Sequence, residues 1–495
     1  MDSEAEAHKG KTKVQSGCED GARQLINLPA LSPGSRAYGR LLRHNPELRP
    51  LILLRNLDQQ ISSALSTPPT STFNQSSPPR TMSELKNVIL VGLGPAGITA
   101  AKSLASSLPA THRLIAINQE EFGFWPIASL RAAVVPGWED KTTLSVDGIF
   151  GKGSRHVVLG GTKVVGVGEG GRSVKVDVEH TTAGFGLEIE ADYIVFATGA
   201  TYAWPARPPT GSRDIQAVVD AYKILQSEVA QAESVLVVGA GATGVEYAGE
   251  VKHQFPDKKV TLVASSAQLF DGPQWNPKFG KSLQSQLEEM NVDIKYGTRL
   301  DTGDLKTGPI SRQEFSFTDG SSVQGKLSCH PQSMIILPIK EPSLLTTFLH
   351  IVHTADYLML ATGIKPNSEV ISQFDPSTVD ASGAVKVLPT FQLVDEAYSH
   401  IFAIGDVTDR PESKQAATAG NHIPILVANI LAMIKGAKPT KEHKVGGPMI
   451  LVTCGPEGGA AQLFGWVVGA WMAKRAKSRS LFVPMFKANY PALVQ

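Results

Sequence analysis

From Asn87 onward, short runs of Val, Ile and Leu alternate with segments of helical length. This alternation is typical of a parallel sheet that is covered by helices on both faces. The pattern therefore predicts an α/β fold class. The clearest predicted strands are Val88–Val91, Leu114–Ile117, Tyr193–Ala197, Val235–Val238, Val260–Val263, Tyr357–Ala361 and Ile401–Ile404.

Two similar units emerge, one beginning at Val88 and the other at Val235. Each has a strand, a glycine turn, a helix and a second strand, which predicts two Rossmann-like dinucleotide-binding domains. We expect residues 83–205 and 366–445 to form the first domain and residues 206–365 the second. Residues 446–495 are expected to form a small C-terminal α+β domain.

An apolar insertion, Cys329–His353, interrupts the second predicted domain. A lid, a partner-binding hairpin and a misread gene boundary all remain open for it. Cys329, His330, His350 and His353 have irregular spacing, so no metal site is predicted there.

Residues 1–82 have no sustained apolar period, and their last part is dominated by Ser, Thr, Pro and Asn. We expect this extension to be disordered and dispensable. It resembles neither a secretory signal nor a mitochondrial transit peptide. Asp2 follows Met1, so N-terminal myristoylation is not expected. Apolar runs such as Leu463–Ala473 are too short to span a bilayer, so no transmembrane helix is predicted.

The composition is that of an ordinary globular protein, with 42% hydrophobic residues and a net charge of +1 over 495 residues. This balance gives no reason to expect a nucleic-acid partner. Cys18, Cys329 and Cys454 lie more than a hundred residues apart and form no CxxC pair. We therefore expect neither a disulfide framework nor a thiolate metal site, and a reducing, cytoplasmic location.

The first glycine motif follows the strand at Val88 and matches G-x-G-x-x-G, with Gly92, Gly94 and Gly97. The first glycine allows a tight turn, the second lets a pyrophosphate approach the backbone, and the third lets helix and strand touch. Pro95 and Ala96 stand between them, where the helix N-terminus would face the phosphates. A glycine turn without a ligand is the alternative.

The second motif, with Gly239, Gly241 and Gly244, repeats this arrangement after Val235–Val238. Two such motifs in one chain are far more specific than one. The strand after the second motif is followed by Ala264 rather than an acid, which leaves both NADH and NADPH possible. Asn118 stands at the corresponding place in the first unit and is a candidate for cofactor binding.

Further phrases close strands near the end of each unit. Ala197-Thr198-Gly199 closes one, Gly363 follows the strand containing Leu360, and Gly405-Asp406 follows the last strand. Glycine lets the chain turn beside a dinucleotide, and Asp406 is the candidate for accepting hydrogen bonds from a flavin ribityl chain. Lys414 either faces the flavin or is exposed.

The order of these motifs resembles the flavoproteins with two dinucleotide domains in the pyridine nucleotide-disulfide oxidoreductase superfamily. The resemblance is strongest to the apoptosis-inducing-factor-like branch, namely the ferroptosis-suppressor type of NAD(P)H:quinone oxidoreductase. Its more particular marks are the runs 128–132, 244–250, 361–367, 403–406 and 477–483.

The resemblance implies FAD on the first glycine motif and NAD(P)H on the second. It also implies that Arg131 and the backbone at Val164 contact FAD, and that Glu246 lies at the nicotinamide side of the flavin. Glu246 is the candidate catalytic residue, which would bind the nicotinamide amide or help to manage a proton. Glu246 and Glu250 are equally consistent with a solvated acidic helix face.

Related disulfide reductases pass electrons to a paired thiol, which this chain lacks. An enzyme that reduces a diffusible quinone-like acceptor is therefore predicted. A reductase of a small electron-carrier protein and a redox-sensing signalling or binding module are the alternatives. The chain is expected to be a monomer or homodimer.

The C-terminal segment carries Phe464, Trp466, Trp471 and Met472, then Lys474, Arg475, Lys477 and Arg479. An apolar patch beside a cationic cluster suits either a membrane surface or a dimer or domain interface. The first alternative would place the protein on a lipid droplet, the mitochondrial outer membrane or the plasma membrane.

Overall fold

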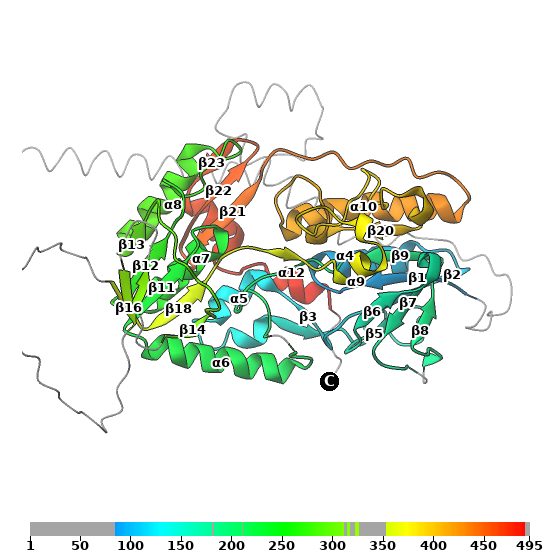
Figure 1. The fold of residues 1–495 in the computed structure, drawn as a ribbon, viewed down its shortest axis with the longest axis horizontal. Coiled ribbons are helices and arrows are strands. Elements are labelled where there is room, and N and C mark those ends of the chain that lie inside the picture. Colours follow the sequence, from blue (N-terminus) through cyan, green and yellow to red (C-terminus); the bar gives the residue numbers. More distant parts are fainter. Residues whose placement is uncertain are drawn as a thin grey trace, which may run out of the picture. The chain divides into compact units, whose positions relative to one another are not determined.

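The computed structural model describes residues 85–180, 183–209, 211–310, 314–316, 322–325 and 353–490. The chain divides after Pro79 into two units, and all described residues lie in the second (Figure 1). The predictions for residues 1–82 lie outside the described residues. So do those for the insertion, except at its end, where β17 (His353–Ala355) begins.

The first parallel sheet has the strand order β20-β9-β1-β2-β5. Its strands are β1 (Lys86–Val91), β2 (His112–Ile117), β5 (Val157–Leu159), β9 (Tyr193–Phe196) and β20 (Ile401–Ala403). Val88 pairs with Leu114 on one side and Tyr193 on the other. These strands are almost entirely buried, as expected for a sheet covered on both faces.

Helices α4 (Pro95–Ser107) and α10 (Ala416–Ile434) pack against each other beside this sheet (Figure 1). An antiparallel sheet of β6 (Val164–Val167), β7 (Ser173–Val176) and β8 (Glu188–Glu190) belongs to the same domain. The chain leaves this domain after β9 and returns to it before β20, so the domain is discontinuous in sequence.

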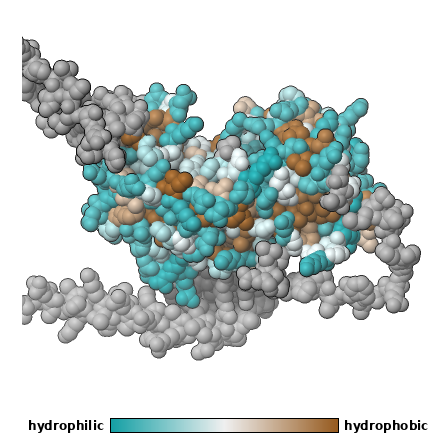
Figure 2. Space-filling view, turned by 90° about the horizontal axis from the view of Figure 1, so that it is seen from below, coloured by the Kyte–Doolittle hydropathy of each residue, from teal (hydrophilic) through white to brown (hydrophobic). Residues whose placement is uncertain are grey.

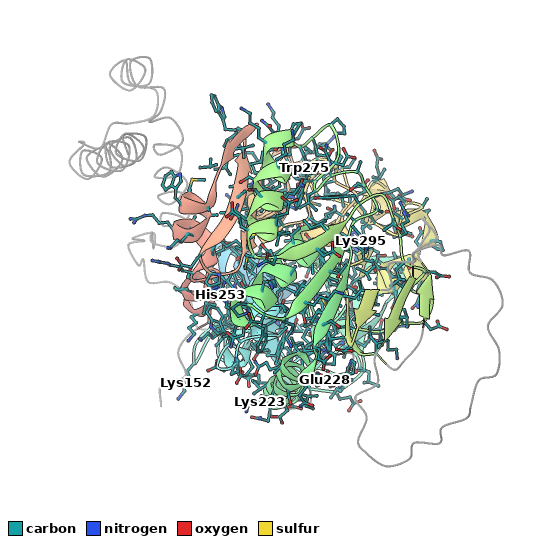
Figure 3. The ribbon with its side chains drawn as sticks, turned by 90° about the vertical axis from the view of Figure 1, so that its left-hand side faces the viewer. Lys152, Lys223, Glu228, His253, Trp275 and Lys295 are labelled. Atoms are coloured by element: carbon teal, nitrogen blue, oxygen red, sulfur yellow. The ribbon has the colours of Figure 1, made fainter. Side chains whose placement is uncertain are left out.

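The second sheet has the order β13-β12-β11-β18-β14. Its members are β11 (Ser234–Val238), β12 (Lys259–Val263), β13 (Val292–Lys295), β18 (Tyr357–Leu360) and the antiparallel edge strand β14 (Gly308–Pro309). The accompanying helices are α6 (Ile215–Gln231), α7 (Ala242–Gln254) and α8 (Pro277–Glu289). Figure 3 views this domain with α8 and the labelled Lys295 of β13 toward the reader.

The C-terminal part forms an antiparallel sheet of β21 (Ile450–Cys454), β22 (Gly458–Leu463) and β23 (Trp466–Val468). Strand β21 packs on α7, where Gly249 permits the contact because a Cβ there would lie 2.8 Å from the Cα of Cys454. Next come α11 (Ala470–Ala473), a π-helical turn (Lys474–Ser478) and α12 (Val483–Ala488).

Shorter elements complete the described fold. They are β3 (Phe122–Phe124), α5 (Pro126–Ala132), η3 (Glu139–Lys141), β4 (Thr143–Ser145), η4 (Glu169–Gly171), β10 (Ala200–Thr201), β15 (Glu314–Ser316), β16 (Ser322–Gly325), β19 (Lys365–Pro366), α9 (Glu369–Phe374), η6 (Pro376–Thr378), η7 (Glu396–Tyr398) and η8 (Gly405–Val407).

The sequence-based predictions of an α/β class, two Rossmann-like domains and all seven strands are confirmed, with strand ends shifted by at most two residues. The face seen from below in Figure 2 carries apolar side chains in separate patches among hydrophilic ones. Such a mixed surface is ordinary for a globular domain.

Helix α10 bears on the expectation that the chain has no transmembrane helix, which stays a prediction. Its 19 residues have a mean hydropathy of 1.4, enough in length and composition for a membrane span. This is weak evidence, since core helices pass the same test. The side chain of Asn429, in this helix, donates hydrogen bonds to the carbonyl oxygens of Thr390 and Lys441. These bonds fix the helix to the rest of the first domain.

Candidate functional site

The first glycine loop is closed where helix meets strand and open at the helix N-terminus. Gly92 has a φ of +97°, and a Cβ there would lie 2.7 Å from the carbonyl oxygen of Ala197. A Cβ on Gly97 would lie 1.9 Å from the carbonyl oxygen of Gly92. At Gly94 a Cβ would meet no atom within 4 Å, and no side chain caps α4, which begins at Pro95. This space and the free backbone N–H groups fit a dinucleotide pyrophosphate.

The second loop has the same geometry. Gly239 has a φ of +107°, and a Cβ there would lie 2.5 Å from the carbonyl oxygen of Ala361. A Cβ on Gly244 would lie 1.8 Å from the carbonyl oxygen of Gly239, whereas one on Gly241 meets nothing within 4 Å. The loop therefore fits a second dinucleotide. Ala264 follows β12 and is buried, so this residue offers no carboxylate to a ribose.

Asn118 holds the first glycine loop in place. Its Oδ1 accepts a hydrogen bond of 2.8 Å from the backbone N–H of Leu93, and its Nδ2 donates one of 2.8 Å to the carbonyl oxygen of Phe122. The structure thus assigns Asn118 a role in shaping the loop, while its contact with the cofactor stays a prediction. Val164 lies buried in β6, and its backbone contact with FAD also stays a prediction.

The two strand-closing phrases meet where the chain crosses between the domains. The hydroxyl of Thr198 donates to the carbonyl oxygen of Asn367 over 2.6 Å, and Asn367 Nδ2 donates back to the carbonyl oxygen of Thr198 over 2.9 Å. Gly199 and Gly363 both have a φ of +67°, so each needs the left-handed conformation that glycine adopts readily. These hydrogen bonds therefore stabilise the two segments in which the chain passes between the domains.

Asp406 lies in η8, directly after β20. The hydroxyl of Tyr202 donates to its Oδ2 over 3.2 Å, and burial raises the pKa of the Asp406 carboxyl. The Lys414 ammonium is half-buried and donates to the carbonyl oxygens of Thr408 (2.6 Å) and Arg410 (3.2 Å). The interpretation of Lys414 as a simply exposed residue is therefore wrong.

A cluster of Glu412, His422 and His443 stands behind Gly405. The Gly405 N–H donates to Nδ1 of His422 over 3.0 Å, so the ring proton of a neutral His422 is on Nε2. That nitrogen lies 2.5 Å from Glu412 Oε1, and Nε2 of His443 lies 2.8 Å from Oε2.

Three ligand-type atoms within 4.8 Å of one another suit a metal by distance. A metal-bound histidine, however, normally donates a proton from its other ring nitrogen, and Nδ1 of His422 accepts one instead. The cluster is therefore better described as a hydrogen-bonded brace behind Gly405.

Glu246 and Glu250 on α7 are buried, with 8% and 1% relative exposure, so their interpretation as a solvated acidic face is wrong. Glu246 Oε1 accepts from Lys477 Nζ over 2.6 Å and from the backbone N–H of Thr453 over 3.0 Å. Burial raises the pKa of Glu250, and the guanidinium of Arg131 opposes this shift.

The guanidinium of Arg131 is held by several contacts within the protein. Its Nε and one terminal nitrogen contact Glu250 at 2.9 and 2.6 Å, and it also donates to the carbonyl oxygens of Ser478 and Arg479. Its guanidinium lies 4.6 Å from the ring centroid of Trp138. The observed role of Arg131 is to join α5, α7 and the C-terminal segment, and its contact with FAD stays a prediction.

The sequence analysis did not predict the contacts of three residues near the two dinucleotide sites. These residues are Lys477, which pairs with Glu246, Tyr202, which donates to Asp406, and Arg207. Lys477 was grouped with surface cations, and nothing in its local pattern indicates a buried partner. Arg207 lies beside the first site, since a Cβ on Gly199 would be 3.1 Å from one of its terminal nitrogens. Its Nε is buried and has no hydrogen-bond partner among the described residues, and its positive charge opposes the rise in the pKa of the Glu120 and Asp406 carboxyls that burial causes.

Three of the four C-terminal cations pair with carboxylates. Lys474 and Arg479 pair with Glu457, at the β21–β22 turn, and Lys477 pairs with Glu246. Phe464 lies at the opposite end of β22, about 17 Å along the strand. Phe464 is therefore separated from the cations, whereas Trp471 is 58% exposed and lies just before the π-helical turn that carries three of them. A membrane or interface role of this segment stays a prediction.

Two known proteins are similar to most of this chain. Apoptosis-inducing factor homolog B of Dictyostelium discoideum is 27% identical over 425 residues, which cover 82% of this chain and 96% of that protein. Ferroptosis suppressor protein 1 of Mus musculus is 29% identical over 398 residues, covering 80% and 94%.

Among solved structures, the sulfide:quinone oxidoreductase of Aquifex aeolicus has the same fold. It gives a TM-score of 0.60 at 16% identity over 82% of this chain and 91% of that one. A family model described as pyridine nucleotide-disulphide oxidoreductase matches residues 86–420. The chain therefore belongs to the pyridine nucleotide-disulphide oxidoreductase family, as an FAD-dependent oxidoreductase with NAD(P)H as co-substrate.

Proposed function

We propose that this chain reduces a quinone with NAD(P)H. The supporting observation is that the sequence contains no cysteine pair to receive electrons. Cys454 is buried beside Glu246 and Glu250, and burial raises the pKa of its thiol. A single thiol is already reduced, and only a disulfide formed with a second cysteine could accept electrons from a flavin. A planar diffusible acceptor needs no protein nucleophile.

Bound FAD supplies the ring that accepts a hydride from NAD(P)H and returns electrons to an acceptor. In this proposal the open loops at Gly94 and Gly241 hold the two dinucleotides. Asp406, held by Tyr202 and the brace behind Gly405, binds the ribityl chain. Arg207 faces a phosphate of the first dinucleotide.

Glu246 and Lys477 are proposed to serve the proton balance. Reduction of a quinone to a quinol takes up two protons, of which NAD(P)H supplies only one as hydride. Glu246 lies on α7, the helix whose N-terminus carries the second glycine motif, and Lys477 reaches it from the C-terminal π-helical turn. The Lys477 ammonium lies 2.6 Å from the Glu246 carboxylate, and both side chains are little exposed to water.

One of the similar proteins has a quinone acceptor in its name. Ferroptosis suppressor protein 1 is similar over most of its length, and the sulfide:quinone oxidoreductase shares the fold. The test is a stopped-flow experiment in which the bound flavin is reduced with NADH or NADPH and then mixed with a ubiquinone analogue. Rapid, saturable reoxidation by the quinone is expected.

A Gly241→Val variant is the matched control, because its side chain fills the space of the second loop only. It should no longer be reduced by NAD(P)H, but after chemical reduction it should be reoxidised by quinone at the rate of the unsubstituted protein. A reduced flavin that survives quinone but is reoxidised by a small iron–sulfur protein would favour the carrier reductase. One indifferent to both would favour the redox-sensing module.

A further inference from the structure

The hairpin between β22 and β23 places an aromatic residue where the backbone favours small polar residues. Leu463 pairs with Trp466, so Phe464 and Gly465 form a two-residue turn. Their φ angles are +50° and +84°, which is the pattern of a type I′ turn. Asn-Gly or Asp-Gly is favoured there, and a bulky residue with positive φ is a conformational outlier.

This aromatic residue contributes little to the core. Phe464 is 58% exposed and Trp466 is 64% exposed. The turn thus carries strain and presents two large apolar side chains to solvent at once. Both features raise the free energy of the isolated protein, which indicates that the exposed rings contact a binding partner or a surface.

The tip is held rigidly. The side chain of Asn276 donates to the carbonyl oxygen of Gly465 over 3.1 Å, and its backbone N–H donates to Gln462 Oε1 over 2.7 Å. Asn276 caps the N-terminus of α8, and the labelled Trp275 marks this end of the helix in Figure 3. The hairpin tip is therefore a fixed projection that can present its rings without ordering a loop.

The size of the tip decides between possible occupants. A stable protein interface buries about 800 Å² on each partner. Two aromatic side chains supply at most about 300–500 Å², and less here because both are partly buried already. A second copy of the chain or a protein partner would therefore need a wider apolar surface around the tip.

The charge beside the tip favours an anionic surface. Lys278 and Lys281 are exposed on the first two turns of α8, next to the Asn276 contact, and the helix carries no acid before Glu288. The acidic neighbour Asp271 accepts a hydrogen bond from Gln268. Aromatic rings flanked by lysines suit the headgroup region of a membrane with anionic lipids.

We propose that the Phe464–Trp466 hairpin tip, with Lys278 and Lys281, docks this protein onto the surface of a membrane that contains anionic lipids. The rings enter the interfacial region while the lysines face the lipid headgroups. This surface lies outside both dinucleotide sites. The inference does not depend on the proposed quinone acceptor, because lipid binding is measured without turnover.

The test is flotation of the full-length protein with vesicles of phosphatidylcholine alone or of phosphatidylcholine with phosphatidylserine. Binding to the anionic vesicles is expected, and it should weaken with salt. Phe464→Asn should weaken it by at least about tenfold, as expected for loss of roughly one buried aromatic side chain. The same variant should raise the thermal unfolding temperature, because Asn fits a positive φ.

Weaker lipid binding together with a higher unfolding temperature would show that Phe464→Asn loses membrane docking and not its fold. Trp466→Thr is a second variant that keeps the strand and should also lose binding. Ile224→Asn is the matched control, since Ile224 is an exposed apolar residue on α6 (61%) and should bind as the unsubstituted protein does. Equal flotation of Phe464→Asn and the unsubstituted protein, or no binding to anionic vesicles, would overturn the proposal. A homodimer that dissociates in Phe464→Asn without lipid would also overturn it, in favour of a second copy.

Discussion

At the residue scale, the two sites depend on places where a side chain is missing. Gly92 and Gly97 have no room for a Cβ because backbone oxygens lie within 3 Å of it. Gly94 does have room, and its φ of −66° is available to any residue. The absence of a side chain at Gly94 is therefore not required by the protein's own packing, which indicates a ligand.

Gly94→Val should consequently fold but bind FAD at least about tenfold more weakly, because its side chain occupies the pyrophosphate position. The measurement is the FAD content of the purified protein and its affinity after reconstitution. Gly186→Val is the control, since Gly186 also has nothing within 4 Å of a Cβ and lies outside the loop. Normal flavin content in Gly94→Val would contradict the assignment of this loop.

Glu246 offers a second test at this scale. Replacing it with Gln keeps its size but removes the charge that holds the Lys477 ammonium. Reoxidation of the reduced flavin by a quinone should slow by about a hundredfold, the lower end of the usual effect of an acid–base group, while FAD stays bound. Stopped-flow absorbance after mixing the reduced protein with a saturating ubiquinone analogue measures this rate. Glu288→Gln, on the exposed face of α8, is the control and should leave the rate unchanged.

At the element scale, buried ion pairs join segments that the strand pattern treats separately. Arg131 of α5 and Glu250 of α7 link the first domain to the second, and the same guanidinium holds the C-terminal segment through two carbonyl oxygens. The strands and glycine turns were predictable because their signals lie within a few consecutive residues. These pairs were not, because either partner alone resembles an ordinary surface charge.

The Arg131–Glu250 pair should respond asymmetrically to substitution. Arg131→Met leaves a buried carboxylate unpaired, so the free energy of unfolding should fall by about 3–5 kcal/mol. The double variant Arg131→Met with Glu250→Leu should recover part of this loss, since no charge is then left unpaired. Urea unfolding of the single and double variants measures the difference. Strictly additive losses would show that the two side chains do not interact.

At the scale of the whole molecule, buried histidines tie stability to pH. Burial lowers the pKa of His422 and of His156 to about 4, from an ordinary value of 6.5. Below pH 6.5 the unfolded chain therefore binds more protons than the folded one, so stability decreases as the pH falls. Hydrogen bonds from His443 and His422 outweigh burial and lower the pKa of Glu412, which acts in the same direction.

The free energy of unfolding should accordingly be highest above pH 6.5 and fall between pH 6.5 and 4, with up to about 3 kcal/mol arising from His422. His422→Asn should show a shallower fall, because Asn accepts the Gly405 N–H but does not titrate. Chemical unfolding at several pH values checks both statements. A flat profile in the unsubstituted protein would contradict the neutral, buried state of His422.

The sequence by itself determined the α/β class, both glycine turns, the seven strands and the family. Each of these depends on backbone requirements expressed within a short stretch, such as a positive φ at Gly92 or a run of buried Val and Ile. Only the tertiary structure decided that Glu246 meets Lys477, 231 residues away, and that Arg131 meets Glu250, 119 residues away. Burial and pairing of a charge depend on what packs against it, and residues distant along the chain supply that environment.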